Sequence, residues 1–200
     1  MITLLYQILF LILTYAIAAI PFGLILAIVF AKKDIRELGS KNIGATNVAR
    51  VVGKKLGFVT LILDGLKGAA MIIAARFAFY DVGNLHLFLV FVAAVAVIGH
   101  IYPIYLNFKG GKGVATAVAV LSALDPITGF LMVCFWIISF VLFRISAISS
   151  LIAIFSSIIL SSHFEAPNSQ IIFCCLLFVL ITIKHKENLI RLLTGEEKKF

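Results

Sequence analysis

Apolar residues run in long stretches along this chain, with short polar connections between them. Seven stretches can be marked off: about Leu4 to Ala31, Gly57 to Tyr80, Leu85 to Leu106, Gly113 to Leu124, Ile127 to Phe143, Ser146 to Ser162 and Ile171 to Ile183. A helix needs about 20 apolar residues to cross a bilayer. The first three stretches reach that length, the others are short, and the fourth is marginal at about 18 Å if helical. The pattern predicts an all-α polytopic membrane protein, a bundle of seven transmembrane helices of which several are short.

Two connections carry strong break signals. Asp125-Pro126 should end one helix and begin the next, because proline lacks the amide donor and clashes with the preceding turn. Ala166-Pro167-Asn168-Ser169 is typical of a turn. The first apolar run has no basic leader and no small-residue cleavage site, so we interpret it as a retained span and not as a signal peptide. We expect residues 1–200 to form a single membrane domain.

Composition strengthens the membrane assignment. Apolar residues make up 62% of the chain and charged residues only 13%, against about 25% charged in ordinary globular chains. A water-soluble enzyme is excluded, because the chain lacks the polar residues needed to cover a soluble core. Cys134, Cys174 and Cys175 all lie inside apolar runs and two of them are adjacent, so they offer neither a disulfide framework nor a spaced metal cluster.

The positive charge is clustered. Of 17 Lys and Arg residues, seven fall between Lys32 and Lys55, two are Lys109 and Lys112, and five fall between Lys184 and Lys199. Since Lys and Arg in short loops stay cytoplasmic, the first cluster places the amino terminus outside, and seven crossings then place the carboxy terminus inside. A five-span alternative that merges or submerges the short stretches keeps the three basic segments on the same side.

Three segments on the predicted cytoplasmic side combine polar side chains with glycine or cations. They are Gly39 to Arg50, Gly99 to Gly113 and Lys184 to Arg191. A loop of small residues followed by a helix presents amide donors and the positive helix end, and nearby Lys and Arg add full charges. These segments predict a site for phosphate.

Other interpretations stay open. Lys109-Gly110-Gly111-Lys112-Gly113 could be only a flexible turn at the membrane edge. Neither glycine loop is a nucleotide-binding P-loop, because Lys54 is followed by Lys55 and Lys112 by Gly113, where a Ser or Thr would hold magnesium. Basic loops can also bind nucleic acid, but these lack interleaved aromatic residues, so we expect no nucleic-acid partner.

Ionisable residues at or inside the apolar stretches add candidates. His185 lies where the last stretch meets the polar tail, and on a helix Asn188 would share its face. The same tail could form an interfacial helix held by anionic headgroups. Asp64 and Lys67, one turn apart, are favoured as a structural ion pair over substrate contacts. For His100 a structural role at the helix end is at least as favoured as a catalytic one.

The three segments resemble, in order and spacing, the motifs of a known enzyme family. Its first motif is similar to Gly39-Ser40-Lys41-Asn42-Ile43-Gly44-Ala45-Thr46-Asn47 with Arg50, its second to Gly99-His100 and Pro103 with Phe108-Lys109-Gly110-Gly111-Lys112-Gly113, and its third to Lys184-His185 and Asn188 with Arg191. On these residues nearly the whole chain resembles the bacterial membrane acyl-phosphate:glycerol-3-phosphate acyltransferases, the PlsY family. Lys41 stands where that family has glycine, which argues against a positive φ there and offers a further charge for phosphate.

The resemblance implies a bacterial inner-membrane enzyme with its active site facing the cytoplasm. It would transfer a fatty acyl group from acyl phosphate to the 1-hydroxyl of glycerol 3-phosphate and form lysophosphatidic acid. Five residues would hold the substrates and take part in catalysis: Ser40, Arg50, Lys109, His185 and Asn188. The phosphate-binding loops would also include Asn42, Gly44, Thr46, Asn47, Gly110, Gly111, Lys112 and Gly113. The partners would be the two substrates, membrane lipid and a soluble enzyme that makes acyl phosphate, and the chain would act as a monomer without a metal or cofactor.

Elementary chemistry agrees with that activity. An acyl phosphate is an activated mixed anhydride, so neither a covalent enzyme nucleophile nor coenzyme A is needed. Catalysis can rest on positioning two anionic substrates beside lysines, Arg50 and loop amides. Of the two candidate bases for the glycerol hydroxyl, His185 and the phosphate of the donor, we favour the phosphate. An organic-phosphate transporter is the alternative, but the polar clusters lie on one side and no internal repeat is detected.

Overall fold

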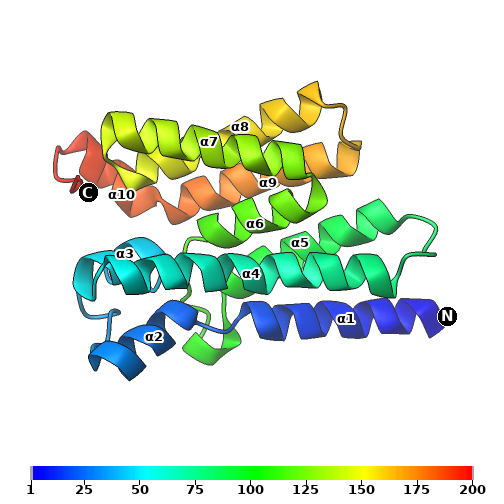
Figure 1. Cartoon of the computed structure of the whole chain (residues 1–200), viewed down its shortest axis with the longest axis horizontal. Coiled ribbons are helices and arrows are strands. Elements are labelled where there is room, and N and C mark those ends of the chain that lie inside the picture. The colour runs from blue at the N-terminus through cyan, green and yellow to red at the C-terminus, as the bar shows by residue number, and fades with distance from the viewer. Residues whose placement is uncertain (1, 200) are drawn as a thin grey trace. The chain divides into compact units, whose positions relative to one another are not determined.

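The structure of the protein is a computed structural model that describes residues 2–199. These residues form helices and turns, with no strand among them. In chain order (Figure 1) the helices are α1 (Ile2–Ala18), α2 (Phe22–Ala31), α3 (Ala45–Val51), α4 (Lys54–Ala78), α5 (Leu85–Ile101), the 3-10 helix η1 (Ile104–Leu106), α6 (Val114–Leu124), α7 (Pro126–Phe143), α8 (Ser146–His163), α9 (Asn168–Lys184) and α10 (Lys186–Leu193). The chain divides into two compact units, one ending at Val120 and the other beginning at Leu121.

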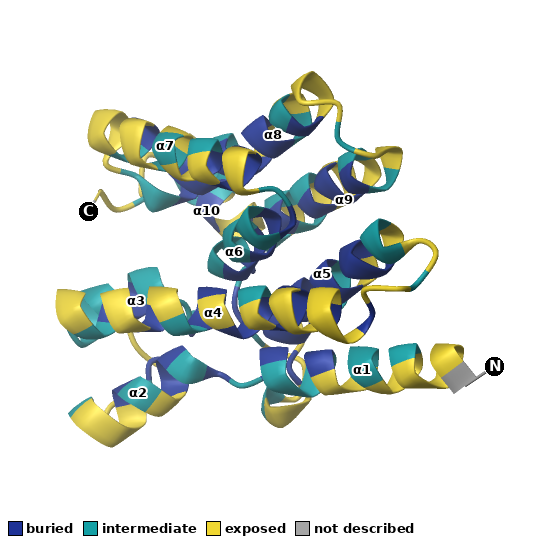
Figure 2. Cartoon of the chain, turned by 45° about the vertical axis from the view of Figure 1, so that its right-hand side comes forward, coloured by how far each residue is buried: buried dark blue, intermediate teal, exposed yellow. Residues whose placement is uncertain are grey.

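The first unit is built on α4 and α5, which pack against each other and against α1, while α2 and the short α3 pack on α4. Faces that meet are buried and outward faces are exposed, as the colours of Figure 2 show. Glycine lets the start of α6 approach α4, since a methyl group at Gly68 would lie 2.8 Å from Thr116 Cγ2. Thr116 Oγ1 also donates to the Asp64 carbonyl over 2.8 Å. The first turn of α6 is therefore held beside the middle of α4.

The apolar run predicted as one helix from Leu4 to Ala31 is divided in two. Helices α1 and α2 are separated at Pro21, the N-cap residue of α2. Proline has no N–H to continue the hydrogen-bond ladder, so the chain turns here. Lys67 Nζ of α4 donates to the Ile20 carbonyl over 2.8 Å and braces the break. By length and composition the stretch Thr3–Ala31 is still one candidate membrane span, but it is built of two helices.

The second unit contains α7, α8 and α9, in which α8 packs on both neighbours and α10 follows α9. The predicted break at Asp125-Pro126 is confirmed. Pro126 is the first residue of α7, and the Asp125 carboxylate accepts from Ile127 N and Thr128 N over 3.1 and 3.3 Å. Helix α9 begins at Asn168, inside the predicted turn, because the helix starts directly after the proline.

Five helical stretches are long and apolar enough to cross a membrane, or six if α9 and α10, bent by 60° at their junction, count as one span. The divided run Thr3–Ala31 is one of the five. Outward side chains such as Phe30, Phe77 and Leu142 are 69%, 76% and 70% exposed, as expected of surfaces that contact lipid. The chain is thus an all-helical membrane protein. Helix α6 has 11 residues, so the seven crossings and the sides of the two termini stay predictions.

Candidate active site

Asn47 organises the first polar segment. The residue is 1% exposed, and its Nδ2 donates to the carbonyls of Ile35, Leu38 and Asn42 over 3.0, 3.0 and 2.8 Å. Its Oδ1 accepts from Ser40 N over 2.8 Å. One buried carboxamide therefore fixes the loop between α2 and α3 at four points.

The other residues of this segment lie around that framework. Asn42 Oδ1 accepts from Gly44 N over 2.9 Å, and Gly44 is the N-cap residue of α3. Thr46 and Arg50 lie on α3 and are half-buried, as is Ser40 in the loop. Because α3 has only seven residues, this segment gains little from a helix dipole, and its positive character comes from the side chains.

Lys41 adopts a left-handed backbone with φ +59°. The sequence argument against a positive φ at this position is therefore wrong. The Lys41 N–H donates to the Leu38 carbonyl over 3.0 Å, so the residue closes a turn in a conformation that favours glycine. Its side chain is exposed, and its charge stands on the outer side of the loop.

An ion pair offsets part of the charge in this segment. Asp34 Oδ1 accepts from Arg36 N over 2.9 Å, and Arg36 Nη2 lies 2.6 Å from Asp34 Oδ2. These hydrogen bonds hold the pKa of the Asp34 carboxyl at about 2, well below its ordinary value. Asp34 is therefore ionised at neutral pH and neutralises one cation at the start of the loop.

The second segment makes a tight turn at the end of α5. Gly110 N donates to the Ile101 carbonyl over 3.1 Å, and Gly111 N donates to the His100 carbonyl over 3.2 Å. A methyl group at Gly110 would clash with the His100 carbonyl oxygen, so only glycine fits this close approach. Both amides bond to the protein's own carbonyls. The glycine pair therefore serves close packing, and the expectation that these two amides would be directed at a ligand is wrong.

Two lysines flank the glycine pair, and a helix begins shortly after it. Lys109 is exposed and Lys112 is half-buried on either side of it. Gly113 then enters α6 with φ +87°. The first amides of a helix have no carbonyl partner within it, so the start of α6 presents donors beside Lys112. A turn held by two backbone hydrogen bonds does not fit the alternative of a merely flexible loop.

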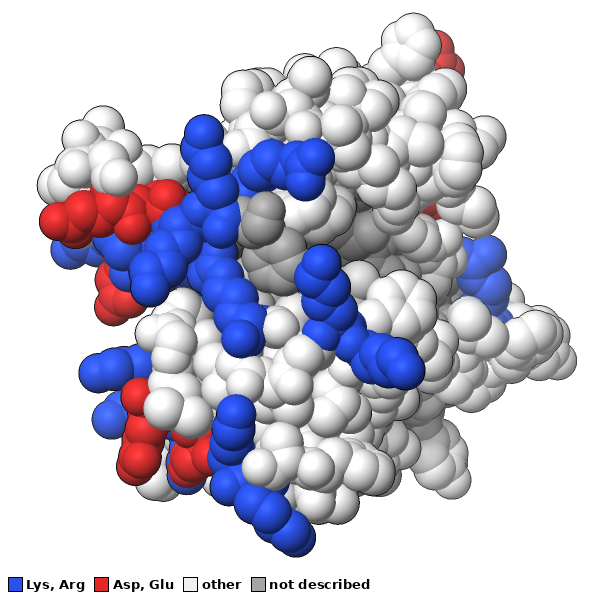
Figure 3. Space-filling view, turned by 60° about the vertical axis from the view of Figure 1, so that its left-hand side comes forward, with Lys and Arg blue, Asp and Glu red and all other residues white. Residues whose placement is uncertain are grey.

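The first two segments share one small core. Ile43 and Val48 of the first segment are buried in a cluster with Ile35 and residues of α2, and Leu106 of η1 packs against this cluster. The loop before α3 and the chain leading to Lys109 are therefore neighbours in the first unit. Figure 3 shows Lys and Arg side chains gathered on the face where α2 ends and α4 begins, with fewer Asp and Glu among them.

The third segment lies in the second unit, at the bend between α9 and α10. His185 is 3% exposed, and its Nδ1 lies 2.8 Å from the Ile181 carbonyl oxygen. A carbonyl only accepts, so Nδ1 carries a hydrogen and Nε2 of the neutral ring is an acceptor. Asn188, 6% exposed, donates from Nδ2 to Glu197 Oε1 over 2.6 Å. The bend thus gives both predicted residues a buried and oriented setting.

Glu197 completes this cluster and was not predicted from the sequence. Its Oε2 accepts from Arg191 Nε over 2.7 Å, and its side chain is 5% exposed. The tail folds back because the amides of Glu196 and Glu197 both donate to the Arg191 carbonyl. No spacing rule separates Glu197 from its neighbour Glu196, so only the folded tail identifies it.

The predicted ion pair within α4 is confirmed. Lys67 Nζ lies 2.9 Å from Asp64 Oδ1, and His100 Nδ1 lies 3.6 Å from the same oxygen. All three side chains are buried. The ion pair therefore extends to the residue whose carbonyl receives Gly111 N.

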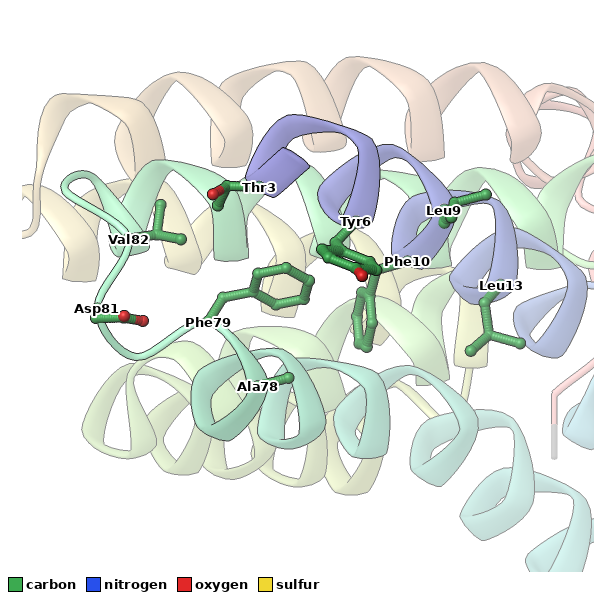
Figure 4. A pocket seen from close by; sticks show the side chains of 9 residues that line it. All are labelled: Thr3, Tyr6, Leu9, Phe10, Leu13, Ala78, Phe79, Asp81 and Val82. Atoms are coloured by element: carbon green, nitrogen blue, oxygen red, sulfur yellow. The ribbon is translucent and has the colours of Figure 1, made fainter. Parts of the chain in front are cut away.

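A cavity of about 520 Å³ lies at the opposite end of the first unit, between the start of α1 and the end of α4 (Figure 4). Its lining is largely apolar, with Tyr6, Phe10 and Phe79 prominent and Asp81 at one side. It contains none of the predicted site residues. Nowhere in the described part of the chain do three His, Cys, Asp or Glu side chains come together where they could hold a metal ion.

Known proteins resemble this chain along almost its full length. The family model described as glycerol-3-phosphate acyltransferase matches residues 8–195. A glycerol-3-phosphate acyltransferase of Wolbachia pipientis is 44% identical over 192 residues, covering 95% of this chain and 96% of that protein. One from Pelagibacter ubique is 41% identical over 187 residues, covering 93% of each.

Two crystal structures of PlsY (YgiH), an integral membrane glycerol 3-phosphate acyltransferase, share the fold. The glycerol 3-phosphate form is 34% identical with a TM-score of 0.91, covering 98% of this chain and 96% of that one. The lysophosphatidic acid form is 33% identical with a TM-score of 0.87, covering 98% and 95%.

Proposed function

Because the chain belongs to the glycerol-3-phosphate acyltransferase family, we propose that it transfers a fatty acyl group from acyl phosphate to the 1-hydroxyl of glycerol 3-phosphate. The products are lysophosphatidic acid and inorganic phosphate. The observation that carries the proposal is the shared core that joins the Asn47-held loop to the turn bearing Lys109 and Lys112. Two cationic loops on one framework suit two substrates that each bear a phosphate.

Acyl transfer from an acyl phosphate mainly requires the enzyme to position the two substrates. The hydroxyl oxygen of glycerol 3-phosphate forms a bond to the acyl carbonyl carbon, and the bond from that carbon to the phosphate oxygen breaks. The departing phosphate keeps the electron pair and takes the hydroxyl proton. Arg50, Lys109 and Lys112 offset the repulsion between the two anions, and the amides at the start of α6 bind phosphate oxygens. Ser40 orients a substrate by its hydroxyl, and no enzyme nucleophile or cofactor takes part.

The bend between α9 and α10, in the second unit, supplies two further residues of the proposal. Asn188 and His185 hold the glycerol moiety, with the Nδ1–H of His185 engaged by Ile181 so that Nε2 is an acceptor. Asn188 has its amide nitrogen engaged by Glu197, which fixes the direction of its carbonyl oxygen. The hydroxyl is oriented by these groups, while the donor phosphate remains the base.

We further propose that both units form one monomeric domain in the inner membrane of a bacterium. Seven crossings place the amino terminus outside and the basic segments and carboxy terminus in the cytoplasm. Glycerol 3-phosphate then enters from the cytoplasm, and the acyl chain stays in the bilayer. A soluble enzyme that makes acyl phosphate supplies the donor.

The decisive experiment supplies purified protein in lipid with palmitoyl phosphate and radiolabelled glycerol 3-phosphate, without coenzyme A or added metal. We expect labelled lysophosphatidic acid. A parallel reaction contains palmitoyl-coenzyme A in place of palmitoyl phosphate. Product from the coenzyme A ester alone would overturn the donor assignment, and no product from either donor would overturn acyl transfer itself.

Single substitutions test the roles of the cations. Arg50→Ala and Lys109→Ala should raise KM for a phosphorylated substrate by about tenfold or more, because each removes a charge-assisted hydrogen bond of about 1.5–3 kcal/mol. His185→Ala should abolish most turnover. Arg76→Ala is the matched control, since Arg76 lies in the last turn of α4, at the other end from the basic segments. A fully active His185→Ala variant would remove that residue from the site.

A further inference from the structure

A buried ionisable cluster lies beneath the second segment. Asp64 and Lys67 of α4 and His100 of α5 have side chains that are 3%, 3% and 5% exposed. Removing charged groups from water is unfavourable even when they are paired. A buried cluster of this kind needs a physical reason.

Lys67 has a structural reason. Its Nζ reaches the Ile20 carbonyl over 2.8 Å at the break between α1 and α2, and lies 5.8 Å from the ring centroid of Phe22. Asp64 supplies the opposite charge at 2.9 Å. These contacts account for the ion pair. They do not explain His100, because Lys67 would bind both Asp64 and the Ile20 carbonyl without it.

His100 lies between the ion pair and the glycine turn. On one edge of its ring, Nδ1 faces Asp64 Oδ1 at 3.6 Å, which is too long for a hydrogen bond. On the other edge, a methyl group built on Gly111 would clash with Nε2. The His100 carbonyl receives Gly111 N over 3.2 Å. Both the ring and the backbone carbonyl of His100 thus lie against Gly111.

We propose that His100 is a positioning residue for the reaction. Asp64 keeps the imidazole in place, and the imidazole supports Gly111 from below. The turn then holds Lys109 and Lys112 at the positions where they meet substrate phosphate. This inference rests on the proposed function, since it assigns the turn to substrate binding. It adds a part of the machinery that never touches the substrate.

Gly111 offers a direct test of contact between turn and ring. Its backbone is not in the left-handed region, so alanine is tolerated there by conformation, and the three atoms nearest to its methyl all belong to the imidazole of His100. We expect Gly111→Ala to raise KM for glycerol 3-phosphate about tenfold while kcat changes less than about threefold. His100→Asn shortens the side chain but keeps an N–H near the Nδ1 position, towards Asp64. It removes support from the turn and should itself raise KM about fivefold.

The double variant decides the proposal. In the His100→Asn background the added methyl has room, so Gly111→Ala should raise KM less than about twofold further. Gly83→Ala is the matched control, because nothing lies within 4 Å of a methyl group there. Equal effects of Gly111→Ala in both backgrounds would overturn the proposal, as would a wild-type KM for His100→Asn. A purely structural role would lower the melting temperature without this dependence of KM on both residues.

Calorimetric binding of glycerol 3-phosphate separates this inference from the proposed function. If wild-type protein makes no lysophosphatidic acid from either acyl donor, acyl transfer fails, yet the same non-additive pattern in Kd still supports the positioning role. If the protein is active and the effects add, the positioning role fails alone. If the wild-type protein neither acylates nor binds glycerol 3-phosphate, both are overturned.

The link to Asp64 has its own measurement. Asp64→Asn alone would leave Lys67 charged and buried, so it is combined with Lys67→Met, which removes both charges together. We expect KM for glycerol 3-phosphate to rise about fivefold in the pair variant. His100→Asn should add less than about twofold to that increase. An unchanged KM in a folded Asp64→Asn/Lys67→Met protein would remove Asp64 from the positioning role.

Discussion

At Lys41 a single residue combines a cost in backbone conformation with a gain in charge. A left-handed conformation costs an L-residue with a side chain about 1–2 kcal/mol, and glycine escapes that cost but loses about 0.5–1 kcal/mol of chain entropy. We expect Lys41→Gly to raise the unfolding free energy by about 0.5–1 kcal/mol. Lys41→Ala keeps the φ cost and should not stabilise. Denaturation of the two variants in the same detergent gives the comparison, and equal stability of both would show that φ +59° is not strained here.

The charge of Lys41 is tested by the same pair of variants. Both remove the ammonium group, so any part it takes in phosphate binding is lost equally. KM for the phosphorylated substrates should therefore rise to the same extent in Lys41→Gly and Lys41→Ala, although only the first is stabilised. This separates the conformation of the residue from its chemistry.

Residue identity could be predicted from the sequence better than residue role. Ser40, Asn42 and Asn47 lie in one polar segment of the sequence. Their spacing does not indicate which of them holds the loop in place. Asn47 differs because its carboxamide reaches back to the carbonyls of Ile35 and Leu38. Those partners precede the segment, and a hydrogen bond between them depends on how the loop folds. Sequence patterns carry no direct signal for such a bond.

At the scale of elements, the tail after α10 is anchored by one carboxylate. Glu197 accepts from Asn188 and Arg191 in a setting where its side chain is 5% exposed. We expect Glu197→Ala to lower the unfolding free energy by about 2–3 kcal/mol, because two charge-assisted bonds are lost and a buried amide loses its acceptor. Melting temperature and turnover are measured together. Turnover should fall as well, since Asn188 loses its orientation.

Glu196→Ala is the matched control for this substitution. It removes the same side chain from the adjacent exposed position. A comparable loss of stability in both variants would show that net charge of the tail matters and the buried contacts do not.

Helix boundaries were predicted correctly where a proline lies between two apolar stretches. They were missed where the proline lies within one stretch. Asp125-Pro126 was recognisable because a carboxylate that can cap a helix precedes the proline. Pro21 was hidden because its neighbours on both sides are apolar, and hydropathy alone does not distinguish a bent span from a straight one. The partner that braces the break, Lys67, lies 47 residues after Ile20, whose carbonyl it binds.

At the scale of the whole molecule, hydropathy predicted the class correctly because a membrane helix is recognised by length and composition. That rule loses power for α6. With 11 residues it spans about 16 Å, roughly half the hydrocarbon thickness. Its packing on α4 through Gly68 and Thr116 explains how a short helix is held in place, but packing does not decide whether it crosses.

Cysteine labelling decides the number of crossings. In a background where Cys134, Cys174 and Cys175 are replaced by alanine, single cysteines are introduced at exposed connections and treated with a membrane-impermeant maleimide in intact cells. Seven crossings predict labelling at Gly83 and Ile127 and protection at Tyr105 and Glu196 until the membrane is permeabilised. Positions 105 and 127 flank α6, so comparing their labelling shows whether α6 crosses the membrane.

The pair flanking α6 gives a clear outcome in either direction. If α6 crosses, Tyr105→Cys and Ile127→Cys react on opposite sides. If it only dips into the bilayer, both react on the same side, and the later connections change sides accordingly. Labelling of Glu196→Cys from outside would place the tail, with Asn188 and Glu197, away from the cytoplasm. The proposed site would then lose its third segment, because charged phosphate substrates cannot reach both faces at once.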